Sequence, residues 1–172
     1  LELVVKDIVG ETVGTSRIAL KVPQFDDETP AFSSLILADK IERVPTRSLG
    51  AGQFVLGASK VRPRINEEFK RDESMGIYVE FYNLGAKDDD SGLPDGEITY
   101  QIAKADSPDV AILDVTEQLA DIRGASTGQV VIEKMLPLEK LGLEPGSYKL
   151  SLKLKDNVTN ETLTPTATFK VI

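Results

Sequence analysis

The chain contains no cysteine, no histidine and no tryptophan. Without cysteine it can form neither a disulfide nor a thiolate metal site. Without histidine, a Ser-His-Asp triad, a Cys-His dyad and a histidine zinc site are impossible within the chain. Histidine is also the commonest general base near neutral pH. We therefore expect no enzymatic activity.

An excess of basic charge and a long apolar run are also missing. The chain has 20 Lys and Arg against 28 Asp and Glu, a net charge of −8. Nonspecific binding to a nucleic-acid phosphate backbone needs a positively charged protein surface, and so does binding to an anionic membrane. No apolar run approaches the roughly 20 residues of a membrane span. We predict no nucleic-acid partner and no membrane insertion. A hydrophobic content of 41% and a mean hydropathy of −0.13 are typical of a globular protein.

The sequence does contain a repeat of its beginning at its end. Residues 1–22 align with residues 150–171 at a constant offset, with a one-residue step in the turn that pairs Glu11-Thr12 with Glu161-Thr162. The identical pairs are Leu1 and Leu150, Leu3 and Leu152, Lys6 and Lys155, Asp7 and Asp156, Val9 and Val158, Lys21 and Lys170, and Val22 and Val171. Such repeats indicate tandem units. We expect residues 1–22 to be a β-hairpin left from a preceding copy in a longer protein.

Apolar residues alternate with polar ones along most of the chain, as in Leu150-Ser-Leu-Lys-Leu154. A period of two places these residues on one face of a strand. The predicted strands are 1–7, 12–22, 34–38, 53–58, 74–84, 96–104, 111–115, 128–135, 147–156 and 162–172. A short helix is predicted at Val115–Ile122, with Asp114 as its cap. The fold class is all-β, an antiparallel β-sandwich of the immunoglobulin or fibronectin type with an extra N-terminal hairpin.

Residues 23–33, PQFDDETPAFS, show no alternation and have the composition of a linker. They separate the hairpin, 1–22, from a sandwich domain at 34–172. A lone hairpin is marginally stable in water, so its apolar face must be covered. The cover could be its own domain, a second chain or a preceding domain. We expect its own domain or a second copy, which makes protein the expected partner.

The run Leu143-Glu-Pro-Gly-Ser-Tyr148 precedes a predicted strand. It is similar to the tyrosine corner of fibronectin-type sandwiches, in which the tyrosine hydroxyl bonds an upstream backbone group. The alternative is a type II turn followed by a half-buried tyrosine.

The densest acidic stretch lies between two predicted strands, at residues 87–97. Calcium binds six to eight oxygen ligands on a bent loop, and several carboxylates here could supply them. The candidate calcium ligands are Asp88, Asp90, Asp95 and Glu97. The spacing departs from an EF-hand, because Gly92 stands where an oxygen ligand is expected. The alternative is a solvated loop without a metal or cofactor.

Two further groups of residues have alternative interpretations. Tyr78 and Tyr82 share one face of a predicted strand, where they could form a glycan-binding platform or cover the outside of the sheet. Five basic residues could form a docking patch or balance local charge. They are Lys60, Arg62, Arg64, Lys70 and Arg71.

Three segments and the opening hairpin carry a resemblance to a known group of proteins. The segments are Ser34-Leu-Ile-Leu-Ala-Asp39, Gly76-Ile-Tyr-Val-Glu-Phe-Tyr-Asn-Leu84 and Leu143–Asp156. They resemble the C-terminal β-rich region of bacterial GWxTD-domain proteins and of acidobacterial proteins related to von Willebrand A domains. The GWxTD motif itself does not occur here. The resemblance implies an accessory module of a larger, exported protein, periplasmic or extracellular.

Overall fold

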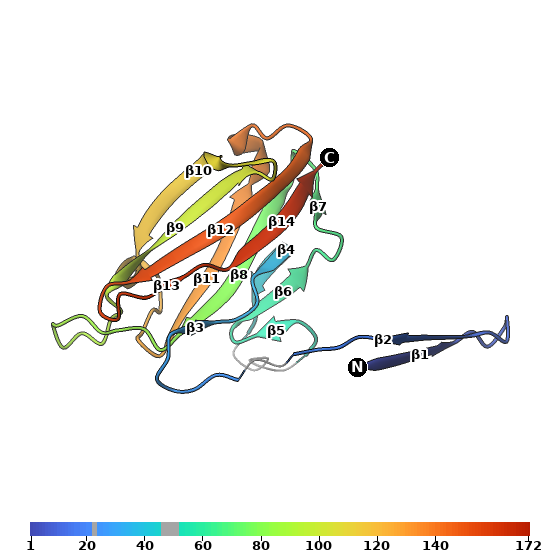
Figure 1. Ribbon diagram of the computed structural model, residues 1–172, viewed down its shortest axis with the longest axis horizontal. Helices are drawn as coiled ribbons and strands as arrows, with labels where there is room; N and C mark the ends of the chain where they lie inside the picture. Colours follow the sequence, from blue (N-terminus) through green and yellow to red (C-terminus); the bar gives the residue numbers. More distant parts are fainter. Residues whose placement is uncertain (22–23, 46–51) are drawn as a thin grey trace.

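Two β-sheets pack face to face, and a separate hairpin projects from them (Figure 1). The computed structural model describes residues 1–21, 24–45 and 52–172. Val22 lies outside the described residues; it is the last residue of the predicted strand 12–22 and the repeat partner of Val171. The first sheet has the order β10 (Ser107–Gln118), β9 (Gly96–Lys104), β12 (Gly146–Asp156), β14 (Thr166–Val171) and β7 (Glu68–Phe69), with β13 (Thr162–Leu163) beside β12. The second has the order β11 (Gln129–Pro137), β8 (Ser74–Tyr82), β4 (Ile36–Arg43), β6 (Ser59–Pro63) and β5 (Val55–Leu56), with β3 (Ala31–Phe32) beside β8.

The strand order is that of an immunoglobulin-like sandwich, and the predicted fold class is confirmed. In one sheet β4, β8 and β11 lie in the order of strands A, B and E, and in the other β9, β12 and β14 lie in the order C, F and G. β10 adds an edge strand next to β9. The pairings within these sheets are antiparallel except that of β14 with β7, which is parallel.

The core lies between the sheets and is filled by alternate residues of each long strand. On β12 the side chains of Leu150, Leu152 and Leu154 are fully buried, whereas Lys153, between two of them, and Lys155, after the last, are exposed. The neighbouring strand β9 adds Ile98, Tyr100 and Ile102 to the same layer. Similar alternation on β8 of the other sheet supplies the facing layer, which includes Ile77, Val79 and Phe81. The two-residue period therefore predicted correctly which side chains form the core.

The predicted tyrosine corner is present at the start of β12. The Tyr148 hydroxyl donates a hydrogen bond of 2.6 Å to the backbone carbonyl of Glu144. The ring is buried and stacks on Phe169 of β14, with 5.5 Å between ring centroids. The alternative, a simple turn before a half-buried tyrosine, does not describe this geometry.

The helix predicted at Val115–Ile122 is wrong. β10 continues to Gln118, and only Leu119–Asp121 form a single 3-10 turn, η2. Asp114 is not a helix cap: it lies within β10 opposite Gln101, whose side-chain amide donates to its carboxylate at 2.9 Å. Pairing with β9 outweighs the helix propensity of this segment, as tertiary context often does. A second 3-10 turn, η3 (Leu138–Leu141), follows β11.

The predicted linker is held against the sandwich where the structure describes it. Ala31 and Phe32, its near-final residues, form β3 and pair with β8. Upstream, the side-chain amide of Asn83 donates to the carbonyls of Asp26 at 2.9 Å and Thr29 at 3.1 Å. Segment 24–33 is thus a strap along one end of the sandwich.

The N-terminal hairpin forms its own two-stranded sheet of β1 (Glu2–Lys6) and β2 (Val13–Arg17). In Figure 1 it extends away from the sandwich, and every residue of both strands is exposed. The expectation that it packs on its own domain is therefore wrong. Within the described residues there is no helix that could span a membrane.

Candidate functional site

The turn of the N-terminal hairpin is built around one aspartate. Asp7 Oδ1 accepts hydrogen bonds from the backbone N–H groups of Val9, at 2.9 Å, and Gly10, at 3.0 Å. These two donors hold the pKa of Asp7 below its usual value, the Gly10 N–H having the larger effect. Glu11 then takes a left-handed conformation, and the Asp7 N–H closes the turn on the carbonyl of Thr12.

The turn after β12 is the same structure, 149 positions later. Asp156 Oδ1 accepts from the N–H groups of Val158, at 2.8 Å, and Thr159, at 3.1 Å. Asn160 is left-handed, and the Asp156 N–H bonds the carbonyl of Glu161. Every residue of the first turn therefore corresponds to the residue 149 positions later. The predicted one-residue step in the turn is wrong.

The strand pairing of the two hairpins also has the same register at the pairs that both form. Lys6 pairs with Val13 in the first hairpin, and Lys155 pairs with Thr162 in the second. At the other end, Glu2 pairs with Arg17 and Ser151 with Thr166. The constant offset relates all four pairs. Residues 1–18 therefore have the shape of the hairpin that closes the sandwich.

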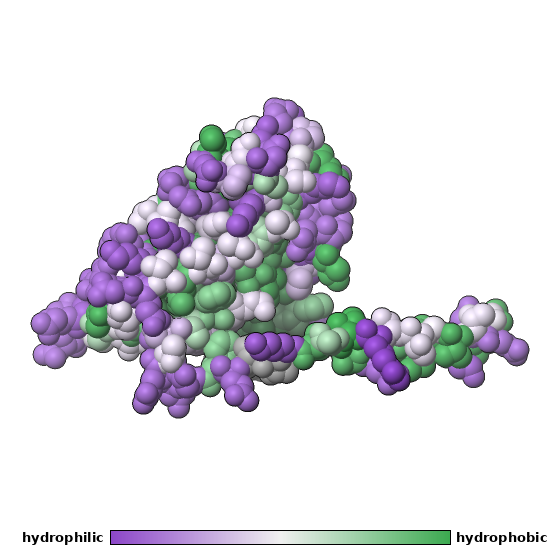
Figure 2. Space-filling model, viewed as in Figure 1, coloured by the Kyte–Doolittle hydropathy of each residue, from purple (hydrophilic) through white to green (hydrophobic). Residues whose placement is uncertain are grey.

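The two hairpins differ in burial. Leu1, Leu3 and Val5 are 66%, 47% and 67% exposed, whereas Leu150, Leu152 and Leu154 at the equivalent positions are 0% exposed. Ile18 and Leu20 extend the exposed apolar face. Figure 2 shows hydrophobic residues along the hairpin outside the body of the protein. A contiguous exposed apolar face of this kind is uncommon on monomeric proteins.

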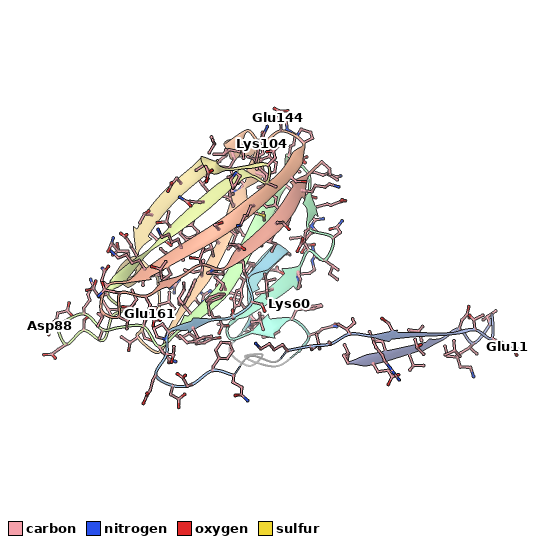
Figure 3. All side chains as sticks on the ribbon, viewed as in Figure 1. Glu11, Lys60, Asp88, Lys104, Glu144 and Glu161 are labelled. Atoms are coloured by element: carbon pink, nitrogen blue, oxygen red, sulfur yellow. The ribbon has the colours of Figure 1, made fainter. Side chains whose placement is uncertain are left out.

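The acidic loop does not assemble the predicted calcium ligands. Asp88 lies at the outer end of the loop (Figure 3), while Asp95 Oδ1 accepts a hydrogen bond of 3.1 Å from the Asn157 side chain. Glu97 lies on β9, and Asp90 is exposed in a left-handed conformation. In the described part of the chain, no three acidic side chains come together as a metal site. The calcium prediction has no geometric support in these residues.

Tyr78 and Tyr82 cover the outside of the second sheet instead of forming an open platform. Tyr78 is 2% exposed and packs with Ala38 and Val61. Both hydroxyls donate to the Glu80 carboxylate, which also accepts from the Gln129 side chain at 2.7 Å. Burial, followed by the bond to Glu80, raises the pKa of Tyr82 to about 12. The same two causes raise the pKa of Tyr78 further.

A cleft of about 530 Å³ runs beside β11. Three of the four carboxylates that line it are paired: Glu80 binds the two tyrosines, Glu133 accepts from Ser59 at 2.6 Å, and Glu117 binds Lys134 at 2.8 Å. Glu117 also accepts from the buried Tyr100 hydroxyl. Burial and then Glu117 raise the pKa of this tyrosine above its usual range. Each of these three carboxylates therefore binds a neighbouring group of the domain itself.

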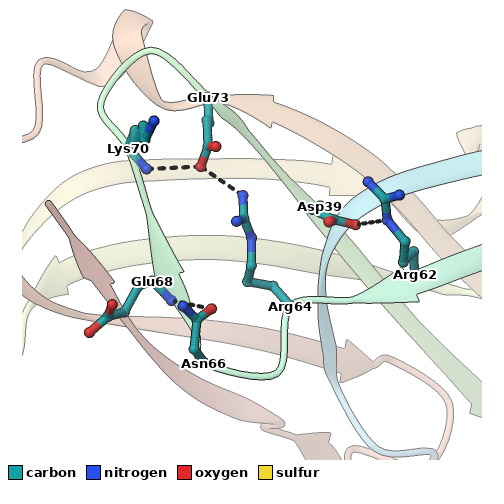
Figure 4. A network of polar contacts seen from close by, with 7 residues as sticks. All are labelled: Asp39, Arg62, Arg64, Asn66, Glu68, Lys70 and Glu73. Atoms are coloured by element: carbon teal, nitrogen blue, oxygen red, sulfur yellow. Dashed lines mark hydrogen bonds and ion pairs between the residues drawn. The ribbon is translucent and has the colours of Figure 1, made fainter.

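Three of the five basic residues are engaged in ion pairs with neighbouring carboxylates. Arg62 contacts Asp39 at 2.7 Å, and Arg64 contacts Glu73 at 2.7 Å (Figure 4). Arg71 contacts Glu144 at 3.1 Å. The Lys70 backbone N–H and then Arg64 hold the pKa of Glu73 below its usual value. For these arginines, local charge balance is the interpretation that the contacts support.

Sequence reasoning missed two residues that organise these surfaces. Glu80 stands between two tyrosines at a spacing of two, so the Tyr-x-Glu-x-Tyr pattern could have indicated a shared carboxylate. Gly85 donates its N–H to Asp156 Oδ2 at 2.8 Å, and no local pattern connects two residues so far apart.

Comparison with known proteins leaves the resemblance untested. No protein-family model matches the chain, and no curated protein does either.

Proposed function

We propose that this chain is a non-enzymatic β-sandwich module with a structural or protein-interaction role in a larger, exported bacterial protein. The observation that carries the proposal is the uncovered apolar face of the N-terminal hairpin, formed by Leu1, Leu3, Val5, Ile18 and Leu20. A two-stranded hairpin is marginal alone in water, so this face gains stability from a protein partner.

The sandwich itself supports a structural role. Its most buried carboxylate, Asp156, accepts backbone N–H groups. Three carboxylates of the cleft beside β11, Glu80, Glu117 and Glu133, bind tyrosines, lysine and serine within the domain. Such groups stabilise a scaffold. The bacterial and exported setting rests on the resemblance of residues 34–39, 76–84 and 143–156 to envelope-type β-rich regions.

Sedimentation velocity of the full chain over a range of concentrations tests the proposal. We expect concentration-dependent association, because the apolar face is accessible. Leu3→Asp places a charge on that face and should abolish association. Thr15→Asp is the matched control, since Thr15 pairs with Val4 and lies on the opposite face of the hairpin. A wild-type chain that stays monomeric, with β1 amides exchanging like those of an unfolded peptide, would contradict the proposal.

A further inference from the structure

We propose that the partner of the β1–β2 hairpin is the body of another sandwich of this kind, in which β1 and β2 take the places of β12 and of the strands that follow it. This inference rests on the proposed function and names the partner. It starts from the identity of the two hairpins in turn hydrogen bonds, left-handed residue and pairing register.

The residues that the two hairpins share are those that a sandwich needs. Leu150 and Leu152, matched by Leu1 and Leu3, are buried in the core. The outward-facing positions differ between the two hairpins: for example, Val4 of β1 corresponds to Lys153 of β12. A dimer made only by two apolar hairpin faces would need the leucines. It would not need the turn residues Asp7 and Val9, which are shared as well.

Asp7 provides the first feature that specifies the partner. Its counterpart Asp156 uses both oxygens: Oδ1 binds the turn, and Oδ2 accepts the Gly85 N–H from the loop after β8. Asp7 Oδ1 binds its own turn in the same way. Among the described residues no hydrogen bond to Asp7 Oδ2 is present, so this oxygen can accept an equivalent loop N–H from a partner.

Val9 provides the second feature. Its counterpart Val158 lies so close to Gly85 that a Cβ on the glycine would stand 2.3 Å from the valine Cβ. Only glycine fits there. Val9 is 96% exposed, and in the described part of the chain no residue stands beside it as Gly85 stands beside Val158. The partner loop must therefore present a glycine whose N–H faces Asp7.

The free edge of β1 provides the third. β12 pairs with β14 on one side and with β9 on the other, from Tyr148 to Asp156. Among the residues that the structure describes, β1 pairs with β2 on one side and has no strand on the other. A partner strand equivalent to β9 would satisfy the second edge, and the facing sheet would cover Leu1, Leu3 and Val5.

The test extends the full chain with a sandwich body that lacks its own terminal hairpin: residues 24–149 are placed directly before Leu1. The measurement is hydrogen exchange at Glu2–Lys6. We expect exchange there to slow by roughly 100-fold or more relative to the unextended chain, approaching that of β12. The reference protein is 24–171 followed by 23–172, in which the first sandwich keeps its natural hairpin.

Three changes in the extended chain sharpen the test. Leu3→Asp, and separately Gly85→Leu in the added body, should remove the protection of β1 and leave the second sandwich folded. Thr15→Asp should leave β1 protected. Because Gly14 and Ser16 stand where Leu163 and Pro165 pack, a second version carries Gly14→Leu and Ser16→Pro to restore core volume.

The proposal is overturned if β1 stays unprotected in both extended versions while the reference protein folds. It is also overturned if the unextended chain forms a dimer that protects β1 and the extension does not compete with it, since a second copy would then be the partner. In that case the proposed interaction function would stand. If the full chain stays monomeric in the sedimentation experiment but β1 is protected in the extended chain, the expected self-association is wrong, whereas the hairpin still binds a protein partner, the incomplete sandwich.

Discussion

The hairpin at the start of the chain and the hairpin that closes the sandwich have the same turn and opposite surroundings. Asp7 and Asp156 each bind two N–H groups of their own turn, and both hairpins keep one register. Yet the leucines of the first are exposed and those of the second are buried. The comparison separates the local part of hairpin formation from the contribution of packing.

The largest expected difference is in the core leucines. Leu152→Ala should lower the free energy of unfolding by about 2–5 kcal/mol, because it leaves a cavity between the sheets. Leu3→Ala at the equivalent position should change it by less than about 0.5 kcal/mol, since that side chain faces solvent. Urea unfolding followed by circular dichroism measures both. Equal losses would break the comparison and show that β1 packs on the sandwich.

The next largest difference is expected between the two turn aspartates, in how much their removal lowers the free energy of unfolding. Asp156→Ala removes the acceptor of three backbone N–H groups in a buried site, which should cost at least about 1–3 kcal/mol of unfolding free energy. Asp7→Ala should leave the global unfolding transition unchanged, because its turn is outside the core. If both substitutions shift the urea midpoint, the first hairpin is part of the cooperative unit.

Gly85 tests the contact that the first hairpin lacks. Gly85→Ala puts a methyl group 2.3 Å from the Val158 Cβ and should destabilise the fold by about 1–3 kcal/mol through overpacking. Gly128→Ala is the control, because its new Cβ would meet only the Ser126 hydroxyl at 4.0 Å. Thermal unfolding compares the two. A neutral Gly85→Ala would mean that the 156–160 turn can move away from the loop.

The smallest expected effect is the loss of turn stability in the first hairpin at low pH. The pKa of Asp7 is lowered from 3.8 by the Gly10 and Val9 N–H groups, so the ionised form stabilises the turn. This contribution is complete above pH 3.8 and is lost as the pH falls through the lower value in the folded hairpin. NMR titration of the Asp7 carboxyl carbon should give a midpoint below 3.8, and Gly10 amide shifts should move with it. A midpoint at or above 3.8 would show that the turn is not populated.

The two-residue period located most of the sandwich because it depends on one face of each strand being buried. It succeeded for β8, β9 and β12, whose inward residues are apolar without interruption. It missed β6, where Lys60 and Arg62 alternate with Ser59 and Val61 and the apolar signal is weak. It also placed a helix at the end of β10, an edge strand whose exposed residues carry little alternation.

The candidate sites were harder to predict, because they depend on distance across the fold. Clustered acids along residues 88–97 do not share one site, since β9 carries Glu97 away from the loop. The tyrosine corner was recognisable because donor and acceptor are four residues apart. The bond from Gly85 to Asp156 spans 71 positions and left no local signal.

The amino-acid sequence by itself determined the strands with strong alternation, the turn that Asp7 and Asp156 each organise, and the repeat that relates them. These depend on near neighbours along the chain, through backbone hydrogen bonds and strand periodicity. Only the tertiary structure decided which copy is buried. Burial requires β9 along one edge of the hairpin, a facing sheet over its leucines and Gly85 at its turn. Within the described residues, the sandwich supplies all three to β12 and none of them to β1.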